Sequence, residues 1–208
     1  MLEELVRAAE SDPDIGCVGP KIYYHADRTR LWSAGGLLRF RESMTRERGM
    51  GERDRGQYDR DEEVPYVNGC ATLIKRSVLE ETGLWDPLFY LALDDADWCT
   101  RMKRLGYKCF YAHRAVLYHR VAVTVGGYTA RRTFYNGRSA ALFVRRYGRF
   151  RDWLSFLLAT AAALPLAFLR ELPRGNQGAA IAKLRGVIDG LTVEMTPPPG
   201  PAGPPPTL

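Results

Sequence analysis

The sequence is poor in cysteine, with four among 208 residues. They stand at positions 17, 70, 99 and 109, and they form no C-x-x-C pair and no other tight zinc spacing. We therefore expect a reduced, cytosolic environment in which the thiols serve as small core residues. A secretory signal is also lacking at the start, where residues 1–14 are typical of an amphipathic helix running into a turn.

Acidic side chains are missing from one long stretch. From Trp98 through Arg151 the sequence holds 13 Lys or Arg and no Asp or Glu. Such a stretch suits an anionic partner, namely a phosphate-bearing substrate, an acidic lipid surface or nucleic acid. The alternative is a basic face that water solvates. The sequence has no recognised nucleic-acid-binding module or interleaved aromatic platform, so no nucleic-acid partner is expected.

The remaining composition, with 46% hydrophobic and 26% charged residues, is that of an ordinary globular protein. The length suffices for one sizeable domain with a buried core. Helical and alternating patterns follow one another along the chain, which predicts an α/β fold. We expect helices at 2–10, 76–82, 94–105, 128–147, 150–170 and 177–191, and strands at 17–24, 31–40, within 64–75, at 107–112 and at 115–121. The strands around 64–75 and 108–119 are expected to pair.

Residues 41–62 are charged and punctuated by glycine. They lack apolar periodicity, so we expect a long, mobile loop of the kind that is often functional in a compact domain. After it, Asn68-Gly69 predicts a tight turn or a bulge between two short strands. Gly83 and Gly106 are expected to end the helices that precede them.

Three acidic residues, Asp94, Asp95 and Asp97, stand directly after an aromatic run and directly before a basic helix. Like charges this close repel, and a protein accepts the repulsion when a metal, a substrate proton or a helix end uses the carboxylates. The predicted topology returns His119 to the same sheet edge, and Asp/His pairs bind divalent metals or share proton transfer. The alternative reading has acids that complement a helix start and a histidine that ends a strand.

The segment VNGCATLIKRSVLEETGLWDPLFYLALDDADWCTRMKRLGYKCFYAHRAVLYHRV, residues 67–121, resembles the acceptor-side half of family 2 glycosyltransferases, the group that contains rhamnosyl- and galactofuranosyltransferases. The family's motifs occur here in order and at plausible spacing. Residues 3–24 also resemble the family's segment just after its metal-binding D-x-D. The likeness covers residues 1–147. The matching motifs, in chain order, are a small-residue strand near Gly69, a G-x-W-D run from Gly83 to Asp86, the aromatic pair Phe89-Tyr90, the acidic run from Asp94 to Arg101, Gly106, and a strand ending in Tyr118-His119.

The resemblance implies a GT-A fold that transfers a sugar from a nucleotide-sugar donor to a saccharide or lipid-linked glycan, with inversion. Asp95 would be the base that deprotonates the acceptor, and Asp94 would orient acceptor or base. His119 would join the D-x-D carboxylates in holding Mg²⁺ or Mn²⁺. Substrate contacts are expected from Asn68, Gly69, Cys70, Trp85, Asp97 and Arg120. Replacing Asp97 by Asn should lower turnover far less than replacing Asp95 by Asn, since an acid at a helix start contributes only about 1 kcal/mol to stability.

The family's first half, with its nucleotide-binding strands and its D-x-D, has no counterpart in these residues. The sequence DPD at Asp12 to Asp14 matches D-x-D literally, but it lies in a turn after a helix. The DAD at Asp95 to Asp97 is the start of a helix. We therefore expect residues 1–147 to be the C-terminal half of a GT-A domain.

The C-terminal region joins basic to apolar sequence. A group of arginines precedes a 17-residue apolar run, 153–169, which Ser155, Thr160 and a kinking Pro165 interrupt. A spanning helix needs about 20 apolar residues, so a helix lying in an anionic membrane surface is expected of region 148–192. The alternative is a helix that packs in the core. Residues 193–208 are proline-rich and are expected to be a disordered tail.

The resemblance implies an inverting glycosyltransferase of polysaccharide or cell-wall biosynthesis, and the C-terminal region predicts that it is peripheral on the cytoplasmic face of the membrane. The alternative is a truncated, non-catalytic remnant of such an enzyme that binds glycan or membrane.

Overall fold

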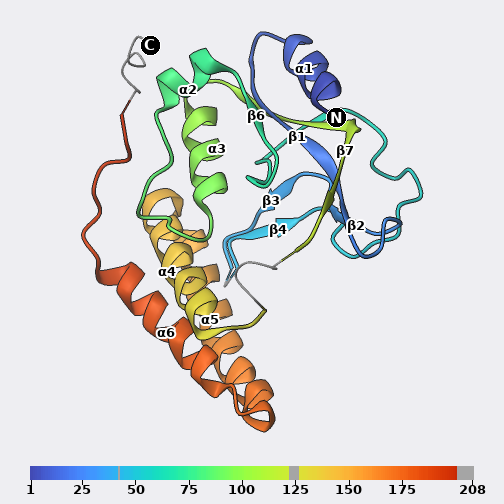
Figure 1. The fold of residues 1–208 in the computed structure, drawn as a ribbon. Coiled ribbons are helices and arrows are strands. Elements are labelled where there is room, and N and C mark those ends of the chain that lie inside the picture. Colours follow the sequence, from blue (N-terminus) through green and yellow to red (C-terminus); the bar gives the residue numbers. More distant parts are fainter. Residues whose placement is uncertain (42, 122–126, 201–208) are drawn as a thin grey trace, which may run out of the picture.

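The computed structural model describes residues 1–41, 43–121 and 127–200 (Figure 1). A mixed sheet lies beside a bundle of C-terminal helices. The elements in chain order are α1 Leu2–Glu10, β1 Ile15–Tyr24, β2 Leu31–Ser33, β3 Gly36–Leu38, β4 Thr45–Glu47, β5 Glu62–Val64, β6 Leu73–Ile74, α2 Arg76–Thr82, α3 Asp94–Arg104, β7 Lys108–His119, α4 Ala130–Tyr147, α5 Phe150–Glu171, η1 Leu172–Arg174 and α6 Gln177–Thr192.

The main sheet is built on the parallel pair β1 and β7. One edge of β1 pairs antiparallel with β2 near the end of β1 and with β6 near its start. The far edge of β7 pairs antiparallel with β5, where Val64 lies opposite Cys109. β3 and β4 form a separate two-stranded sheet. The α/β fold with C-terminal helices is thus confirmed, as is the pairing of the segment near 64 with β7.

The core divides at the sheet because neighbouring strand residues face opposite sides. Cys17 packs in the larger cluster, which also contains Trp98 and Met102 of α3. The next residue, Val18, packs in the smaller cluster with Leu5 of α1. The sheet is therefore buried on both faces, by α1 on one and by α3 on the other.

Two predicted strands differ from the structure. The predicted strand 31–40 is divided into β2 and β3, because Gly35 between them adopts φ 94°, which turns the chain. The predicted strands 107–112 and 115–121 are instead one strand, β7. Its register against β1 shifts between Ala112 and Val116, so the extra residues bulge without ending the pairing.

The segment 41–62 was expected to be a loop, and its described residues contain more order than that. They include β4 and the start of β5, and Glu47 in β4 is buried. The prediction failed because the segment is held by partners distant in sequence, which leave no local periodicity. The turn at Asn68-Gly69 is present, with the Ala71 N–H donating to the Asn68 carbonyl oxygen at 3.3 Å. The strands on either side of it pair with β7 and β1 rather than with each other.

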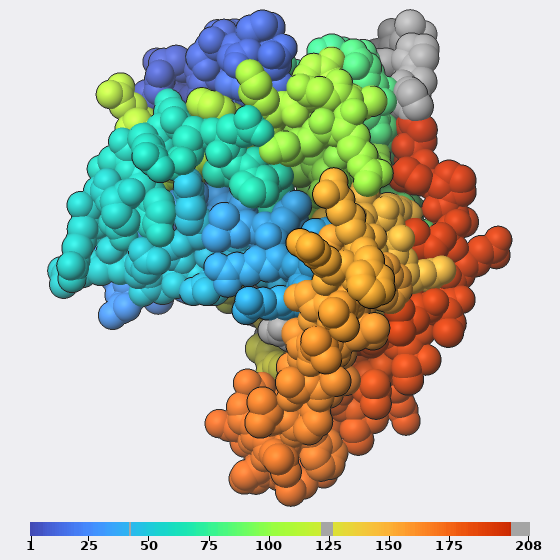
Figure 2. Space-filling model, turned by 180° about the vertical axis from the view of Figure 1, so that it is seen from behind, coloured from blue at the N-terminus to red at the C-terminus, as the bar shows by residue number. Residues whose placement is uncertain are grey.

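The last three helices form a bundle in which α4 packs against α6 (Figure 1). Their backbones come very close, because a Cβ atom added at Gly186 would stand 2.0 Å from the Phe134 carbonyl oxygen. Helix α5 is continuous through Pro165. The predicted break at this residue is therefore wrong. Figure 2 shows α5 and α6 projecting together beyond the body of the sheet.

Residues 193–200 contain no helix or strand and continue from the end of α6 toward α2 (Figure 1). Val193 and Met195 pack against the larger core cluster, and the Val193 carbonyl oxygen accepts a hydrogen bond from Arg145 at 2.9 Å. The beginning of the predicted tail is therefore in contact with the protein. Residues 201–208 lie outside the described residues, and the three predicted regions 1–147, 148–192 and 193–208 stay a prediction.

Candidate active site

The acidic cluster lies in the first turn of α3, after a strained residue. Leu93 is the N-cap residue with φ 64° and ψ 8°, and among the described residues it is the one non-glycine residue with positive φ. A left-handed conformation is costly for leucine, and such strain gathers at functional sites. The backbone N–H of Asp97 donates to the Leu93 carbonyl oxygen at 2.8 Å, which holds the turn and fixes where the acidic side chains leave the helix.

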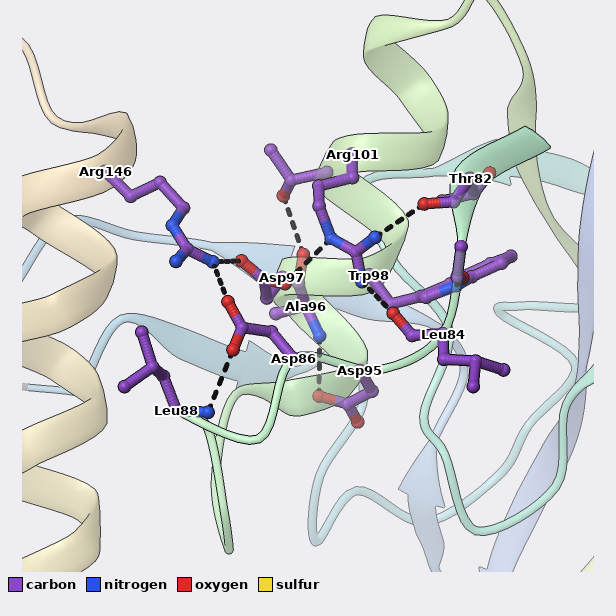
Figure 3. Close-up of polar contacts among 12 residues, drawn as sticks. Thr82, Leu84, Asp86, Leu88, Asp95, Ala96, Asp97, Trp98, Arg101 and Arg146 are labelled. Atoms are coloured by element: carbon purple, nitrogen blue, oxygen red, sulfur yellow. Dashed lines mark hydrogen bonds and ion pairs between the residues drawn. The ribbon is translucent and has the colours of Figure 1, made fainter. Parts of the chain in front are cut away.

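Asp95 is half-buried, and its carboxylate accepts two backbone hydrogen bonds. The N–H of Ala96 donates at 2.7 Å (Figure 3), and the N–H of Gly69 donates at 3.1 Å. Burial raises the pKa of Asp95 to about 7, and the charge of Asp94 adds to the rise, although the two N–H donors oppose it. A carboxyl group with this pKa exchanges its proton near neutral pH, as a general base must.

Asp94 stands next to it and is also half-buried. Burial raises the pKa of Asp94, backbone N–H groups at the helix start oppose the rise, and the charge of Asp97 adds to it. Both residues line two clefts, which meet at this edge of α3. The pair is therefore placed where two bound molecules could meet.

The first cleft, of about 320 Å³, lies between the start of α3, β4 and the end of β7. His119, the last residue of β7, lines it together with Asp94 and Asp95, as the sequence predicted. The His119 ring packs against Trp32 of β2, with 4.9 Å between ring centroids. His119 therefore lies in the same cleft as the acidic turn, as predicted.

The second cleft, of about 500 Å³, lies on the other side of Asp95. It brings together six of the residues predicted from the sequence. Trp85 forms one wall and is stacked on Trp98, with 5.5 Å between ring centroids and 18° between planes. The predicted residues that line this cleft are Asn68, Gly69, Cys70, Trp85, Asp94 and Asp95.

Cys70 is a poor nucleophile in this position. Desolvation raises its pKa to about 12, and the charges of Glu47 and Asp95 contribute. The thiol is therefore protonated at neutral pH. Its place in the cleft suits contact with a substrate rather than attack on one.

Asp97 does not make the substrate contact that the sequence predicted. Its side chain is fully buried, and its Oδ1 accepts hydrogen bonds from Arg146 at 2.9 Å and from the Tyr147 hydroxyl at 2.6 Å. Its Oδ2 accepts from Arg101 at 3.0 Å (Figure 3). With no exposed surface and both oxygens engaged, Asp97 stabilises the fold instead of contacting substrate.

Arg146 of α4 extends this network to a second buried acid. It donates to Asp86 at 2.7 Å as well as to Asp97 (Figure 3). Arg101 donates to the carbonyl oxygens of Thr82 at 2.7 Å and Leu84 at 2.6 Å. The network therefore ties the segment between α2 and α3 to both α3 and α4. Arg120, another predicted contact, is exposed and is not among the residues that line either cleft.

Glu47 is a site residue that the sequence did not reveal. It is buried at the floor of the first cleft, where its carboxylate accepts hydrogen bonds from the Tyr66 hydroxyl at 2.7 Å, from the Asn68 side chain at 3.2 Å and from Ser33. Burial raises the pKa of Tyr66, and the charge of Glu47 adds to it. No sequence signal distinguished Glu47 from the other charges of the segment 41–62.

Two places in the described residues could bind a metal. Cys17, Cys99 and Cys109 have Sγ atoms within 4.8 Å of one another, but all three are buried in the larger core cluster. We interpret these three as core residues, as predicted, whereas the same prediction is wrong for Cys70, which is exposed. His119 offers one ligand in the cleft beside Asp94 and Asp95, and hard cations such as Mg²⁺ need further oxygen ligands.

The chain was compared with known proteins. The family model described as glycosyltransferase like family 2 matches residues 1–149. A search of curated proteins found no match. The matched region contains the strained turn, all the residues that line the two clefts, and the network of Asp97.

Proposed function

The chain belongs to glycosyltransferase-like family 2, and from that premise we propose that it transfers a sugar from a nucleotide-sugar donor to a hydroxyl group of a saccharide or lipid-linked glycan, with inversion. One observation carries the proposal. Asp95 is a partly exposed carboxyl group at the meeting point of two clefts, and burial raises its pKa to about 7. Such a group suits a general base that acts on an acceptor in one cleft and a donor in the other.

In the proposed reaction Asp95 accepts the proton of the acceptor hydroxyl. The acceptor oxygen then forms a bond to the anomeric carbon of the donor sugar. The bond from that carbon to the diphosphate breaks on the opposite face, and its electron pair leaves with the diphosphate. Asp94 helps to keep Asp95 basic through its charge, and the N–H groups of Gly69 and Ala96 hold the carboxylate in place.

A metal ion is part of this proposal. Mg²⁺ or Mn²⁺ would neutralise the leaving diphosphate when bound. His119 would supply one ligand from the first cleft, and such a hard cation would need further oxygen ligands.

The test of the function is the variant Asp95→Asn of the full chain. The change keeps the shape of the side chain and removes the proton acceptor. Turnover, measured as release of nucleoside diphosphate, should fall by roughly 10²- to 10⁴-fold, with little change in donor affinity.

Glu80→Gln is the matched control, because it removes the same charge from a half-buried side chain of α2 that lines neither cleft. It should leave turnover unchanged. Equal turnover of Asp95→Asn and the unchanged protein would contradict the role of Asp95 as a base. The acidic cluster would then only stabilise the start of α3.

We also propose that α5 and α6 bind an anionic membrane surface on its cytoplasmic side. Residues Phe150–Arg174 are long and apolar enough to cross a membrane by length and composition, and 11% of the most apolar window is buried. A helix in the core of a soluble protein would be mostly buried. The exposed apolar side chains of this surface are Phe150, Leu154, Leu157, Leu158, Leu166, Phe168, Leu169, Leu172, Ile181, Leu184 and Ile188.

Arginines stand at both ends of α5, where lipid headgroups would lie. Arg149 and Arg151 are at its start, and Arg170 and Arg174 are at its end. Basic residues at both ends of an apolar helix are typical of a helix that lies in the membrane surface. Region 148–192 therefore suits peripheral attachment.

Vesicle flotation tests this attachment. The double variant Leu157→Gln/Leu158→Gln should bind vesicles containing phosphatidylglycerol about tenfold or more weakly, since each exposed leucine that enters the membrane contributes about 1.5–3 kcal/mol. Leu2→Gln, on the exposed face of α1, is the control and should not change binding. If the unchanged protein floats with vesicles and shows no turnover, the non-catalytic, membrane-binding alternative is favoured.

A further inference from the structure

Residues 193–200, which we call the strap, follow a defined path although they form no helix or strand (Figure 1). Val193 and Met195 pack against the larger core cluster, whereas Glu194 and Thr196 are exposed. Side chains that alternate in this way are typical of an extended chain with one buried side. The strap is therefore held against the protein by its inward side chains.

Two arginines of α4 bind the backbone of the strap. Arg145 donates to the Val193 carbonyl oxygen at 2.9 Å. Arg146, which also binds the buried Asp97, donates to the Thr196 carbonyl oxygen at 3.4 Å. The strap thus passes from α6 along the end of α4 to the network of Asp97.

The end of the strap lies directly on Gly83, the residue that follows α2. A Cβ atom added at Gly83 would stand 2.5 Å from the Pro199 carbonyl oxygen and still closer to that of Gly200, so the two backbones are in contact. Gly83 is buried and adopts φ 80° and ψ 179°, a conformation that residues with a side chain rarely adopt. Glycine is therefore required here both by the end of α2 and by the approach of the strap.

Gly83 connects the strap with one wall of the second cleft. Its carbonyl oxygen accepts a hydrogen bond from Nε1 of the buried Trp98 at 2.8 Å. Trp98 is in turn stacked on Trp85, which lines the cleft and is 38% exposed. Trp85 also follows Gly83 by two residues in the chain. A shift of Gly83 would therefore reach Trp85 through the backbone and through the stacked rings.

We propose that the strap is a positioning segment, which fixes Trp85 and with it the shape of the second cleft. The three prolines 197–199 suit this role, because the φ angle of proline is already fixed and ordering such a chain costs little entropy. Docking of the strap and placement of Trp85 are then linked, so lifting the strap from Gly83 loosens Trp85. This inference concerns the cleft itself and does not depend on the transfer reaction.

Acrylamide quenching of tryptophan fluorescence in the full chain tests the position of Trp85. The triple variant Pro197→Gly/Pro198→Gly/Pro199→Gly raises the entropy cost of ordering the strap and should detach its end from Gly83. Quenching should then be stronger than in the unchanged protein. The increase should disappear when Trp85→Phe is added, because the increase comes from that ring.

The chain offers a matched control for this variant. Pro204→Gly/Pro205→Gly/Pro206→Gly makes the same change in a second run of three prolines, which lies outside the strap. It should leave quenching as it is in the unchanged protein.

Hydrogen exchange measures the same loosening along the backbone. In the variant of prolines 197–199, the amides of residues 84–86 should exchange about 5- to 30-fold faster, as expected when a few local contacts are lost. The amides of α1, on the opposite face of the sheet, should exchange as before and are the internal control.

A double-mutant cycle with Gly83→Ala tests the contact itself. The backbone strain of alanine at this position is the same whether or not the strap is docked, whereas the clash with Pro199 and Gly200 needs a docked strap. Gly83→Ala should therefore lower the midpoint of urea denaturation more in the otherwise unchanged protein than in the variant of prolines 197–199. Circular dichroism would confirm that all four proteins fold.

Three results would overturn the inference. Equal effects of Gly83→Ala in both backgrounds would show that the strap makes no contact with this residue. Unchanged quenching and unchanged exchange of residues 84–86, whatever the urea midpoint, would show that the strap does not position Trp85. An increase in quenching that Trp85→Phe does not remove would assign the change to another tryptophan. None of these measurements depends on turnover, so the strap and the transfer reaction can fail separately.

Discussion

Asp95 and Asp97 belong to the same helical turn and meet opposite surroundings. Asp97 is fully buried among Arg101, Arg146 and Tyr147, so its charge is compensated by two cations and a hydroxyl donor. Asp95 reaches the clefts, where two backbone N–H groups donate to its carboxylate, and within the described residues no cationic side chain forms an ion pair with it. Burial raises the pKa of Asp95 to about 7 as a result.

The comparison shows how a fold gives two neighbouring carboxylates separate tasks. A buried charge with paired cations holds segments together, and removing one partner leaves the others uncompensated. A desolvated carboxyl group without a cation is instead ready to take a proton. Both residues are aspartates of the first turn of α3. The difference between them comes from Arg101 and from Arg146, which lies 49 residues from Asp97 in the sequence.

The largest effect is expected from Asp97→Ala. It leaves Arg101 and Arg146 without their shared acid in the core, which should lower the free energy of unfolding by about 3–5 kcal/mol. Urea denaturation followed by circular dichroism would measure the loss. Asp95→Asn in the same experiment should destabilise little or not at all. A similar loss in both variants would erase the distinction between the two acids.

The pH dependence of turnover reports on Asp95 alone. A base must be ionised, so turnover should be constant well above pH 7 and fall about tenfold per pH unit below it. The free energy of unfolding should show the opposite trend. The folded pKa lies above the unfolded value, so the contribution of this group weakens as pH rises from about 4 to about 7. Kinetics between pH 5 and pH 9 would check the first trend, and a flat profile would contradict the role of Asp95.

A smaller loss is expected from Tyr147→Phe. The change removes one of the hydrogen bonds to Asp97 and leaves both cations in place. The free energy of unfolding should fall by about 1.5–3 kcal/mol, the range for a hydrogen bond to a charged group. Turnover per folded molecule should remain unchanged, and a marked drop in it would link the buried network directly to the reaction.

The smallest effect is expected from Asp94→Asn. It removes the neighbouring charge that helps to raise the pKa of Asp95. The midpoint of the pH–rate profile should therefore move to lower pH, by less than about one unit. A shift to higher pH would show that Asp94 influences the base by another route than its charge.

The sequence predicted the elements whose signals are local. The helix at 94–105 was placed to within one residue of α3, because acids mark its start and Gly106 follows its end. The meeting of His119 with the acidic turn was also predicted, from the order of the strands and the family's motif. Both depend on patterns that short stretches of sequence contain.

What the sequence could not predict depends on partners far along the chain. Asp97 was assigned a substrate contact and a small cost on replacement, since nothing near it indicates that Arg146 of α4 reaches it. Glu47 was placed in a mobile loop, and it is buried because Ser33, Tyr66 and Asn68 surround it. Charge patterns indicate how polar a residue is, and tertiary contacts decide whether it is buried.

The exposed apolar surface of α5 and α6 has a practical consequence for work with the purified protein. In plain buffer, molecules lower their free energy by covering Leu157, Leu158 and their neighbours against one another. Detergent micelles or nanodiscs cover the same surface and remove the reason to associate. The apparent size of the protein in size-exclusion chromatography should then change with the detergent or nanodisc used. A subunit interface would instead give the same oligomeric state in every detergent.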